Sequence, residues 1–97
     1  MSTENLISAV INNDINEVSR LIKAGADINV HNEDGYSVLM LPACFGHEGI
    51  VDKLIQIGVD VHDKNKENAT AYDLACYNNH IDIANNLDNQ MKKIKLN

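Results

Sequence analysis

The sequence predicts an all-α repeat protein, a solenoid of helix-turn-helix units joined by β-hairpin-like turns. Two segments, "LIKAGADINV" (21–30) and "LIQIGVDVHD" (54–63), are near copies separated by 33 positions. The apolar residues of each copy follow the spacing of an amphipathic helix, and each pattern stops at a glycine, Gly25 or Gly58. A fixed period of this length is typical of stacked repeats, so we expect about three copies of one unit.

The first unit, over about residues 1–31, contains a well-marked second helix. Asp14 and Glu17 have the spacing of a capping box, in which each side chain satisfies a backbone N–H at the start of a helix. The apolar stripe of this helix consists of three residues: Val18, Leu21 and Ile22. Gly25 supplies the left-handed conformation that ends the helix, and the Asp- and Asn-rich stretch after it has turn chemistry.

The middle unit (about 32–64) and the third unit (about 65–91) each begin their first helix after a hydroxyl residue. Ser37 and Thr70 are suitable N-caps, and Asp73 can complete a capping box with Thr70. The stripe of the middle unit's second helix is formed by four residues: Ile50, Val51, Leu54 and Ile55. The corresponding helix of the third unit is polar, which is typical of a terminal repeat.

Pro42 is the only proline of the chain, and it falls inside the first helix of the middle unit. If that helix begins at Val38, the missing N–H is the one that would donate to the Val38 carbonyl. The sequence therefore predicts a helix that is kinked or partly 3₁₀, with Cys44 and Phe45 tilted relative to their neighbours.

The middle unit, "NEDGYSVLMLPACFGHEGIVDKLIQIGVDVHDK", resembles the ankyrin repeat. The first unit matches the same pattern at "GADIN", and the third at Thr70, Leu74, Ala75 and His80. The resemblance implies an ankyrin-type solenoid in a single domain over residues 1–91, followed by a basic tail at 92–97. Because both terminal units carry polar residues at apolar positions of the pattern, we expect a complete short array.

The composition excludes several classes of function. The net charge is −6, and an acidic chain repels nucleic acid, so we expect no nucleic-acid partner. We also expect no membrane partner, because no apolar run approaches a membrane span. The two cysteines are too few for a disulfide framework, so a reduced, cytoplasmic protein is expected; export as an effector remains an open alternative.

Catalytic and metal-binding readings of the polar residues are weak. The resemblance implies that His47 and His80 satisfy loop backbone groups. A zinc site formed by these histidines with Cys44 and Cys76 would need four convergent ligands, and the two pairs differ in spacing. We therefore expect no metal, no cofactor and no enzymatic activity.

Four further polar residues lie in the predicted turns. His31 and His62 are expected to be solvated, and Asp27 and Asp60 to serve the turns.

The resemblance implies that a partner protein binds the concave face, made of the turn tips and the exposed side of each first helix. Carried over position by position, the candidate binding residues are Ile11, Asn12, Glu33, Asp34, Tyr36, Cys44, Phe45, Lys66, Glu67, Tyr77 and Asn78. Three of the four aromatic residues of the chain are among them, whereas Tyr72 aligns with the core residue Leu39. Exposed aromatic residues are candidate hot spots, and the acidic residues beside them favour a partner with a basic patch.

The sequence thus predicts a non-enzymatic protein-binding module that acts as a stand-alone adaptor, an inhibitor, or an immunity- or effector-type protein. We expect it to be a monomer on its own. The alternative is a structural protein that self-associates through an exposed strip formed by the aromatic residues Tyr36, Phe45 and Tyr77 together with Ile11.

Overall fold

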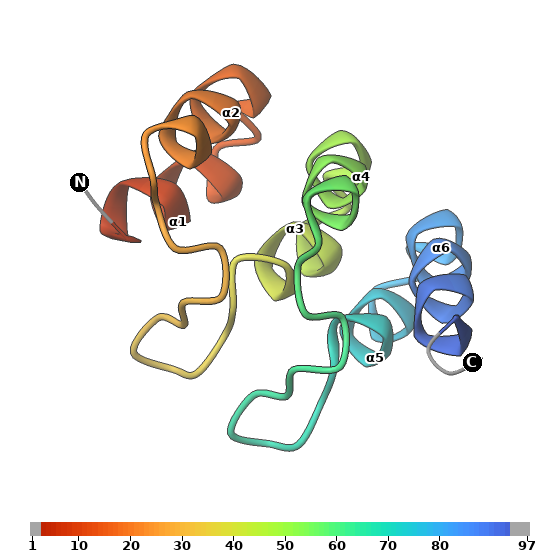
Figure 1. Ribbon diagram of the computed structural model, residues 1–97. Helices are drawn as coiled ribbons and strands as arrows, with labels where there is room; N and C mark the ends of the chain where they lie inside the picture. The colour runs from red at the N-terminus through yellow and green to blue at the C-terminus, as the bar shows by residue number, and fades with distance from the viewer. Residues whose placement is uncertain (1–2, 94–97) are drawn as a thin grey trace.

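The computed structural model describes residues 3–93, which form six helices and no strand. The helices are α1 (Thr3–Ile11), α2 (Ile15–Lys23), α3 (Met40–Phe45), α4 (Glu48–Ile57), α5 (Ala71–Tyr77) and α6 (Ile81–Lys92). They stack in two rows, with α1, α3 and α5 in one row and α2, α4 and α6 in the other (Figure 1). The predicted all-α solenoid is confirmed. Helix α6 continues through Lys92 into the predicted tail, and residues 94–97 of that tail lie outside the described residues.

Two long loops extend from the helices on the side of the first row (Figure 1). We call them the first finger (residues 26–37) and the second finger (residues 59–70). The first finger is hairpin-like, since a single antiparallel bridge joins His31 to Ser37 across it.

The backbone conformation repeats with the same period as the sequence. Residues with a left-handed backbone occur at three positions of the repeat unit, and equivalent residues are always 33 positions apart. The first position holds Asn13, Gly46 and Asn79, the second holds Gly25 and Gly58, and the third holds Gly35 and Asn68. Asparagine tolerates this conformation better than most residues, which explains why it can replace glycine at these places. The period therefore governs backbone conformation even where the residue type has changed.

The predicted helix caps are partly confirmed. Thr70 Oγ1 accepts the Asp73 N–H at 3.2 Å, and Asp73 Oδ2 accepts the Thr70 N–H at 3.0 Å, which completes the capping box. Asp14 caps α2 by accepting the Glu17 N–H at 3.1 Å. The other half of that predicted box is wrong, because the Glu17 carboxylate instead binds the Arg20 guanidinium at 2.6 and 2.8 Å.

Ser37 makes the predicted capping bond, with Oγ accepting the Met40 N–H at 3.2 Å, but α3 begins only at Met40 and its N-cap residue, Leu39, makes no side-chain bond. Met40 occupies the position of Asp73, and its sulfur accepts the Ser37 N–H at 3.4 Å. A buried thioether thus takes the place of the carboxylate in the third unit's capping box.

Pro42 delays the start of α3 rather than adding a 3₁₀ segment, since none occurs within residues 3–93. Helix α3 begins at Met40, whereas α5 begins at Ala71, the counterpart of Val38. The regular hydrogen bond from the Leu41 N–H to the Ser37 carbonyl forms. The one helical hydrogen bond missing here is the bond to the Val38 carbonyl, because Pro42 has no N–H to donate. The ring itself is fully buried.

The core is aliphatic and runs without a break through all three units. Its largest fully buried side chains include Leu6, Val10, Leu39, Met40, Ile50, Leu54 and Leu87. Each such side chain contributes about 1.5–3 kcal/mol by its removal from water. Because the two helix rows and the fingers share this core, the surface residues stand on a rigid support.

Candidate partner-binding surface

The candidate residues on helices lie at the C-terminal ends of α1, α3 and α5. Ile11, Cys44 and Tyr77 occupy the same position in successive units. Each is followed by a residue at the end of the helix or just beyond it: Asn12, Phe45 and Asn78. These helices stand side by side in one row, so the structure places the six residues along one edge of the stack (Figure 1).

Histidines fix the spacing of this edge. His47 Nε2 lies 3.2 Å from the Ile11 carbonyl oxygen, and His80 Nε2 lies 3.1 Å from the Cys44 carbonyl oxygen. A Cβ atom at Gly46 would come within 2.6 Å of the His80 ring, so glycine is required there for close approach as well as for its left-handed backbone. The implied role of the two histidines, to satisfy backbone groups, is confirmed.

Three apolar side chains on this edge are exposed to solvent. The exposed fractions are 41% for Ile11, 50% for Phe45 and 82% for Tyr77. We call these three residues the apolar strip. The Phe45 ring lies 5.7 Å from the His47 ring, centroid to centroid, and is therefore supported from one side.

Two other predicted residues of the edge are engaged in the fold. Cys44 is half-buried, and its sulfur accepts a hydrogen bond from Asn78 Nδ2 at 3.5 Å. Asn78 Nδ2 also donates to the Leu74 carbonyl at 2.8 Å. These side chains hold α3 and α5 together, so their availability to a partner is lower than the sequence suggested.

The finger candidates also divide into exposed and engaged residues. The exposed side chains that carry negative charge are Glu33, Asp34 and Glu67. Lys66 is exposed too, but its Nζ donates to the Glu33 carbonyl at 3.0 Å and so links the two fingers. Tyr36 is half-buried and packs against the core, whereas the sequence placed it among the exposed aromatic residues.

An asparagine holds each finger in shape, and sequence reasoning did not single these residues out. Asn32 Oδ1 accepts the N–H groups of Asp34 and Tyr36, each at 2.9 Å. In the second finger, Asn65 Oδ1 accepts those of Glu67 and Ala69 at 2.9 and 3.0 Å. The signal was present, because these asparagines are 33 residues apart and each precedes a left-handed residue by three positions.

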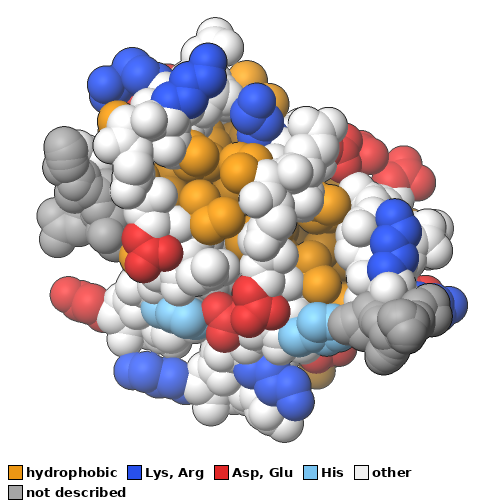
Figure 2. Space-filling model, in the orientation of Figure 1, with side chains coloured by type: hydrophobic (Ala, Val, Ile, Leu, Met, Phe, Trp, Pro, Cys, Tyr) orange, Lys and Arg blue, Asp and Glu red, His pale blue; other side chains and the backbone are white. Residues whose placement is uncertain are grey.

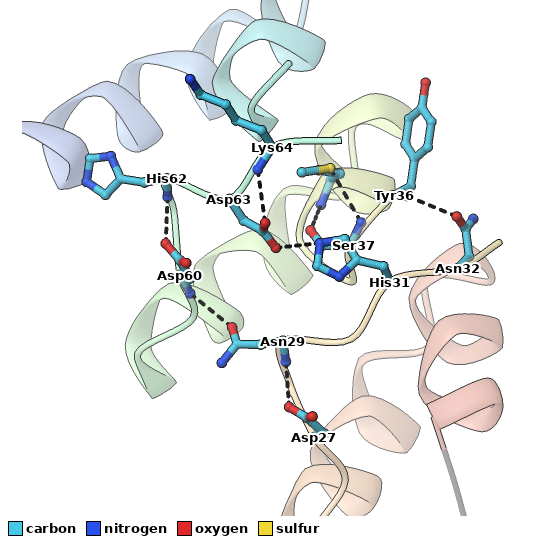
Figure 3. Close-up of polar contacts among 11 residues, drawn as sticks. Asp27, Asn29, His31, Asn32, Tyr36, Ser37, Asp60, His62, Asp63 and Lys64 are labelled. Carbon is cyan, nitrogen blue, oxygen red and sulfur yellow. Dashed lines mark hydrogen bonds and ion pairs between the residues drawn. The ribbon is translucent and has the colours of Figure 1, made fainter. Parts of the chain in front are cut away.

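Polar contacts also join the bases of the fingers (Figure 3). His31 Nε2 lies 2.7 Å from Asp63 Oδ2, and Asn29 Oδ1 accepts the Asp60 N–H at 3.3 Å. His31 is exposed, as expected, and its imidazole also bridges two units.

The two turn carboxylates act as expected. Asp27 Oδ1 accepts the Asn29 N–H, and Asp60 Oδ1 accepts the His62 N–H, both at 2.9 Å (Figure 3).

The open end of the third unit carries a groove of about 450 Å³. Tyr72, Asp73 and Cys76 line it, at positions where the middle unit has buried apolar residues. Tyr72 is half-buried, so its predicted place in the core is only partly realised. A hydrogen bond to Cys76, the charge of that thiol when ionised, and the carboxylates of Asp88 and Asp73 raise the pKa of the Tyr72 hydroxyl.

Two further findings concern the chemistry of the described residues. No group of three or more His, Cys, Asp or Glu side chains comes together in residues 3–93 in a way that could hold a metal ion. None of the helices in this part of the chain is long and apolar enough to cross a membrane.

Comparison with known proteins identifies similar chains. A sequence model of ankyrin repeats in three copies matches residues 6–97. The Caenorhabditis elegans homolog of transient receptor potential cation channel subfamily A member 1 is 37% identical over 76 residues, which are 78% of this chain and 6% of that protein. The Notch-regulated ankyrin repeat-containing protein of Homo sapiens is 44% identical over 50 residues, 52% of this chain and 44% of that protein.

The mitochondrial disaggregase of Bos taurus is 36% identical over 55 residues, 57% of this chain and 8% of that protein. The chain thus spans less than half the length of each of these relatives. Ankyrin repeats are generally non-enzymatic modules for binding other proteins. The family match, the helix rows and the repeating finger geometry agree, and the chain belongs to the ankyrin repeat family.

Proposed function

We propose that residues 1–91 form one domain that binds a partner protein through the apolar strip, as an adaptor, an inhibitor, or an immunity- or effector-type protein. One observation carries this proposal: three large apolar side chains are exposed on three successive units, at the ends of first-row helices. Such residues supply rigid apolar contact area, and their truncation in an interface typically costs more than about 1 kcal/mol each.

The charge of the fingers supports a partner with a basic patch. Glu33, Asp34 and Glu67 are exposed at the finger tips, and the chain as a whole has a net charge of −6. Such a surface accelerates encounter with a basic protein and repels an acidic one. We propose the cytoplasm as the place of this interaction.

The test is a triple variant, Ile11→Ser, Phe45→Ala and Tyr77→Ala. Partners are captured from the native cell on the wild-type protein, identified by mass spectrometry, and then titrated against both proteins by calorimetry. We expect affinity to fall at least about a hundredfold, because three hot-spot side chains are lost. The triple variant should stay folded, with the helical circular dichroism of the wild type and a somewhat lower thermal unfolding midpoint, since Ile11 and Phe45 are 41% and 50% exposed rather than fully exposed.

The matched control is Ile15→Ala with Ile81→Ala, two exposed isoleucines at the starts of second-row helices that are not part of the apolar strip. These changes should leave partner affinity unaltered. Retention of full affinity by the triple variant would exclude the apolar strip as the binding surface.

Self-association through the same strip is the competing function, favoured by the 82% exposure of Tyr77. Sedimentation equilibrium separates the two proposals. A wild-type monomer supports binding of another protein, whereas a dimer that the triple variant abolishes supports self-assembly.

A further inference from the structure

A second surface lies on the other row of helices. A groove of about 180 Å³ opens between α2 and α4, lined by Ser19, Ile22, Lys23, Lys53 and Ile57. Ile57 is 38% exposed and Ile22 is half-buried, so the floor of the groove is apolar and open to solvent. Figure 2 shows hydrophobic side chains next to Lys and Arg side chains over this part of the molecule. The groove shares no residue with the apolar strip.

The repeat supplies an internal comparison for this groove. The same five positions between α4 and α6, one period later, hold Asp52, Ile55, Gln56, Asn86 and Gln90. There, Asn86 Nδ2 donates to Asp52 Oδ1 at 2.8 Å and ties the two helices together. A polar, bridged boundary therefore satisfies the fold, so stacking α2 on α4 does not by itself require an apolar floor with two lysines.

The charge at the groove is opposite to that of the chain. Lys23 and Lys53 form no ion pair among the described residues, whereas the charge of nearby Arg20 is balanced by Glu17 at 2.6 Å. Two unbalanced ammonium groups thus flank an apolar floor in a protein whose net charge is −6. An apolar side chain that entered this groove would bury the exposed Ile57. A carboxylate next to that side chain would lie close to the ammonium group of Lys23 or Lys53.

We propose that this groove docks an acidic amphipathic segment of a partner protein. One aliphatic side chain of that segment inserts between Ile22 and Ile57, and carboxylates one helical turn before and after it pair with Lys23 and Lys53. The small volume limits the insertion to a single aliphatic side chain. The carboxylates provide selectivity, because a basic segment would bring like charges together.

The probe is a blocked alanine-based helical peptide of about 14 residues, with Glu, Leu and Glu spaced one turn apart on one face. Titrated into ¹⁵N-labelled protein, it should shift the amide signals of Ser19, Lys23, Lys53 and Ile57 and leave the apolar strip unmoved. Binding should weaken as salt is raised, and also when Gln replaces both Glu residues or Ala replaces Leu.

A variant that we call the groove-exchange variant tests the lining residues and introduces only side chains that already occur at equivalent positions of this protein. Lys23→Gln, Lys53→Asn and Ile57→Gln install the side chains found at the equivalent positions between α4 and α6. We expect peptide affinity to fall at least about tenfold. The stability of this variant should be near that of the wild type, because the introduced residues are already compatible with this type of boundary.

The matched control is Asn85→Asp with Asn89→Glu, two exposed residues of α6 that do not line the groove. It makes the net charge more negative by the same amount as the groove-exchange variant and should reduce affinity less than about twofold. Equal loss in both variants would assign the binding to overall charge and overturn the proposal. Unaltered binding by the groove-exchange variant, or peptide-induced shifts at the apolar strip alone, would overturn it as well.

Discussion

The imidazole of His80 reaches from one repeat to the backbone of the previous one. Its Nε2 lies 3.1 Å from the Cys44 carbonyl oxygen in a partly buried setting. We expect His80→Ala to lower the free energy of unfolding by about 1–2 kcal/mol, because this carbonyl then loses its partner. Urea denaturation measures the change. His62→Ala is the control, since His62 is exposed and makes only a backbone contact; a similar loss there would contradict this account.

Tyr72 has a raised hydroxyl pKa that depends first on Cys76 and then on the carboxylates of Asp88 and Asp73. We expect Cys76→Ala to lower this pKa towards its ordinary value, whereas Cys44→Ala should leave it unchanged. Absorbance at about 295 nm, in a background where the other two tyrosines are Phe, reports the ionisation of Tyr72 alone.

The sign of the linked stability follows from the direction of this shift. Folding favours the neutral phenol of Tyr72, so its contribution is complete below the pKa of the unfolded chain. The contribution is lost as the pH rises through the higher pKa of the folded state. The wild-type protein should therefore lose more stability than Cys76→Ala in this alkaline range, and equal losses would refute the coupling.

Single residues also show where sequence reasoning stopped. The capping box of Thr70 and Asp73 was predictable because both partners are close in sequence. The one expected for Glu17 failed because the Asp14 N–H already donates to the Ala9 carbonyl at 3.0 Å, and the Glu17 carboxylate pairs with Arg20 instead. The contact of His31 with Asp63 was not predicted, because Asp63 lies in another unit.

At the scale of elements, Pro42 decides where α3 begins. Pro42→Ala restores the N–H that donates to the Val38 carbonyl, and alanine already occupies the equivalent position as Ala75. We expect the helix to lengthen and begin at Val38, as α5 begins at Ala71. Hydrogen exchange of the new amide at position 42 measures this change, and free exchange of that amide would show that no bond to the Val38 carbonyl forms and that Pro42 does not set the boundary.

The stability of Pro42→Ala should change by less than about 1.5 kcal/mol. The recovered hydrogen bond contributes about 0.5–1.5 kcal/mol, whereas the lost burial of ring carbons costs about 0.8 kcal/mol for each methylene. These terms oppose each other because the Pro42 ring is fully buried.

The helices were otherwise largely predictable, because the apolar stripes and terminal glycines that mark them recur in a second unit. Apolar stripes and terminal glycines located α2 and α4, and the hydroxyl caps placed the start of α5. The late start of α3 at Met40 was not predictable, because the sequence shows that Pro42 cannot donate a backbone hydrogen bond but not how the backbone adjusts to its loss. The groove between α2 and α4 was also missed, because its apolar and basic lining is notable only when it is compared with the polar residues at the equivalent positions between α4 and α6.

At the scale of the whole molecule, the three units share one core, and none of them buries its apolar faces alone. Helix α3 packs between α1 and α5, and α4 packs between α2 and α6. A chain of residues 1–64 would therefore expose the α5-facing side of α3 and the α6-facing side of α4. We expect such a chain to lose cooperative thermal unfolding and most of its helical circular dichroism, because a domain of this size has only about 5–15 kcal/mol of stability.

The same reasoning predicts recovery when the missing unit is supplied separately. A peptide of residues 65–97 added to the 1–64 chain should restore helical signal in a concentration-dependent way, because covering the α3 face does not require a continuous backbone. As a control, Gly-Ser-Gly inserted after Glu67 lengthens a finger tip. It breaks the bond from the Ala69 N–H to Asn65 Oδ1 but leaves the helix stack in place, so it should cost only about 1–3 kcal/mol. If the 1–64 chain alone unfolded cooperatively at the wild-type midpoint, stacking would not be the source of stability, and each unit would have to be regarded as an independent fold.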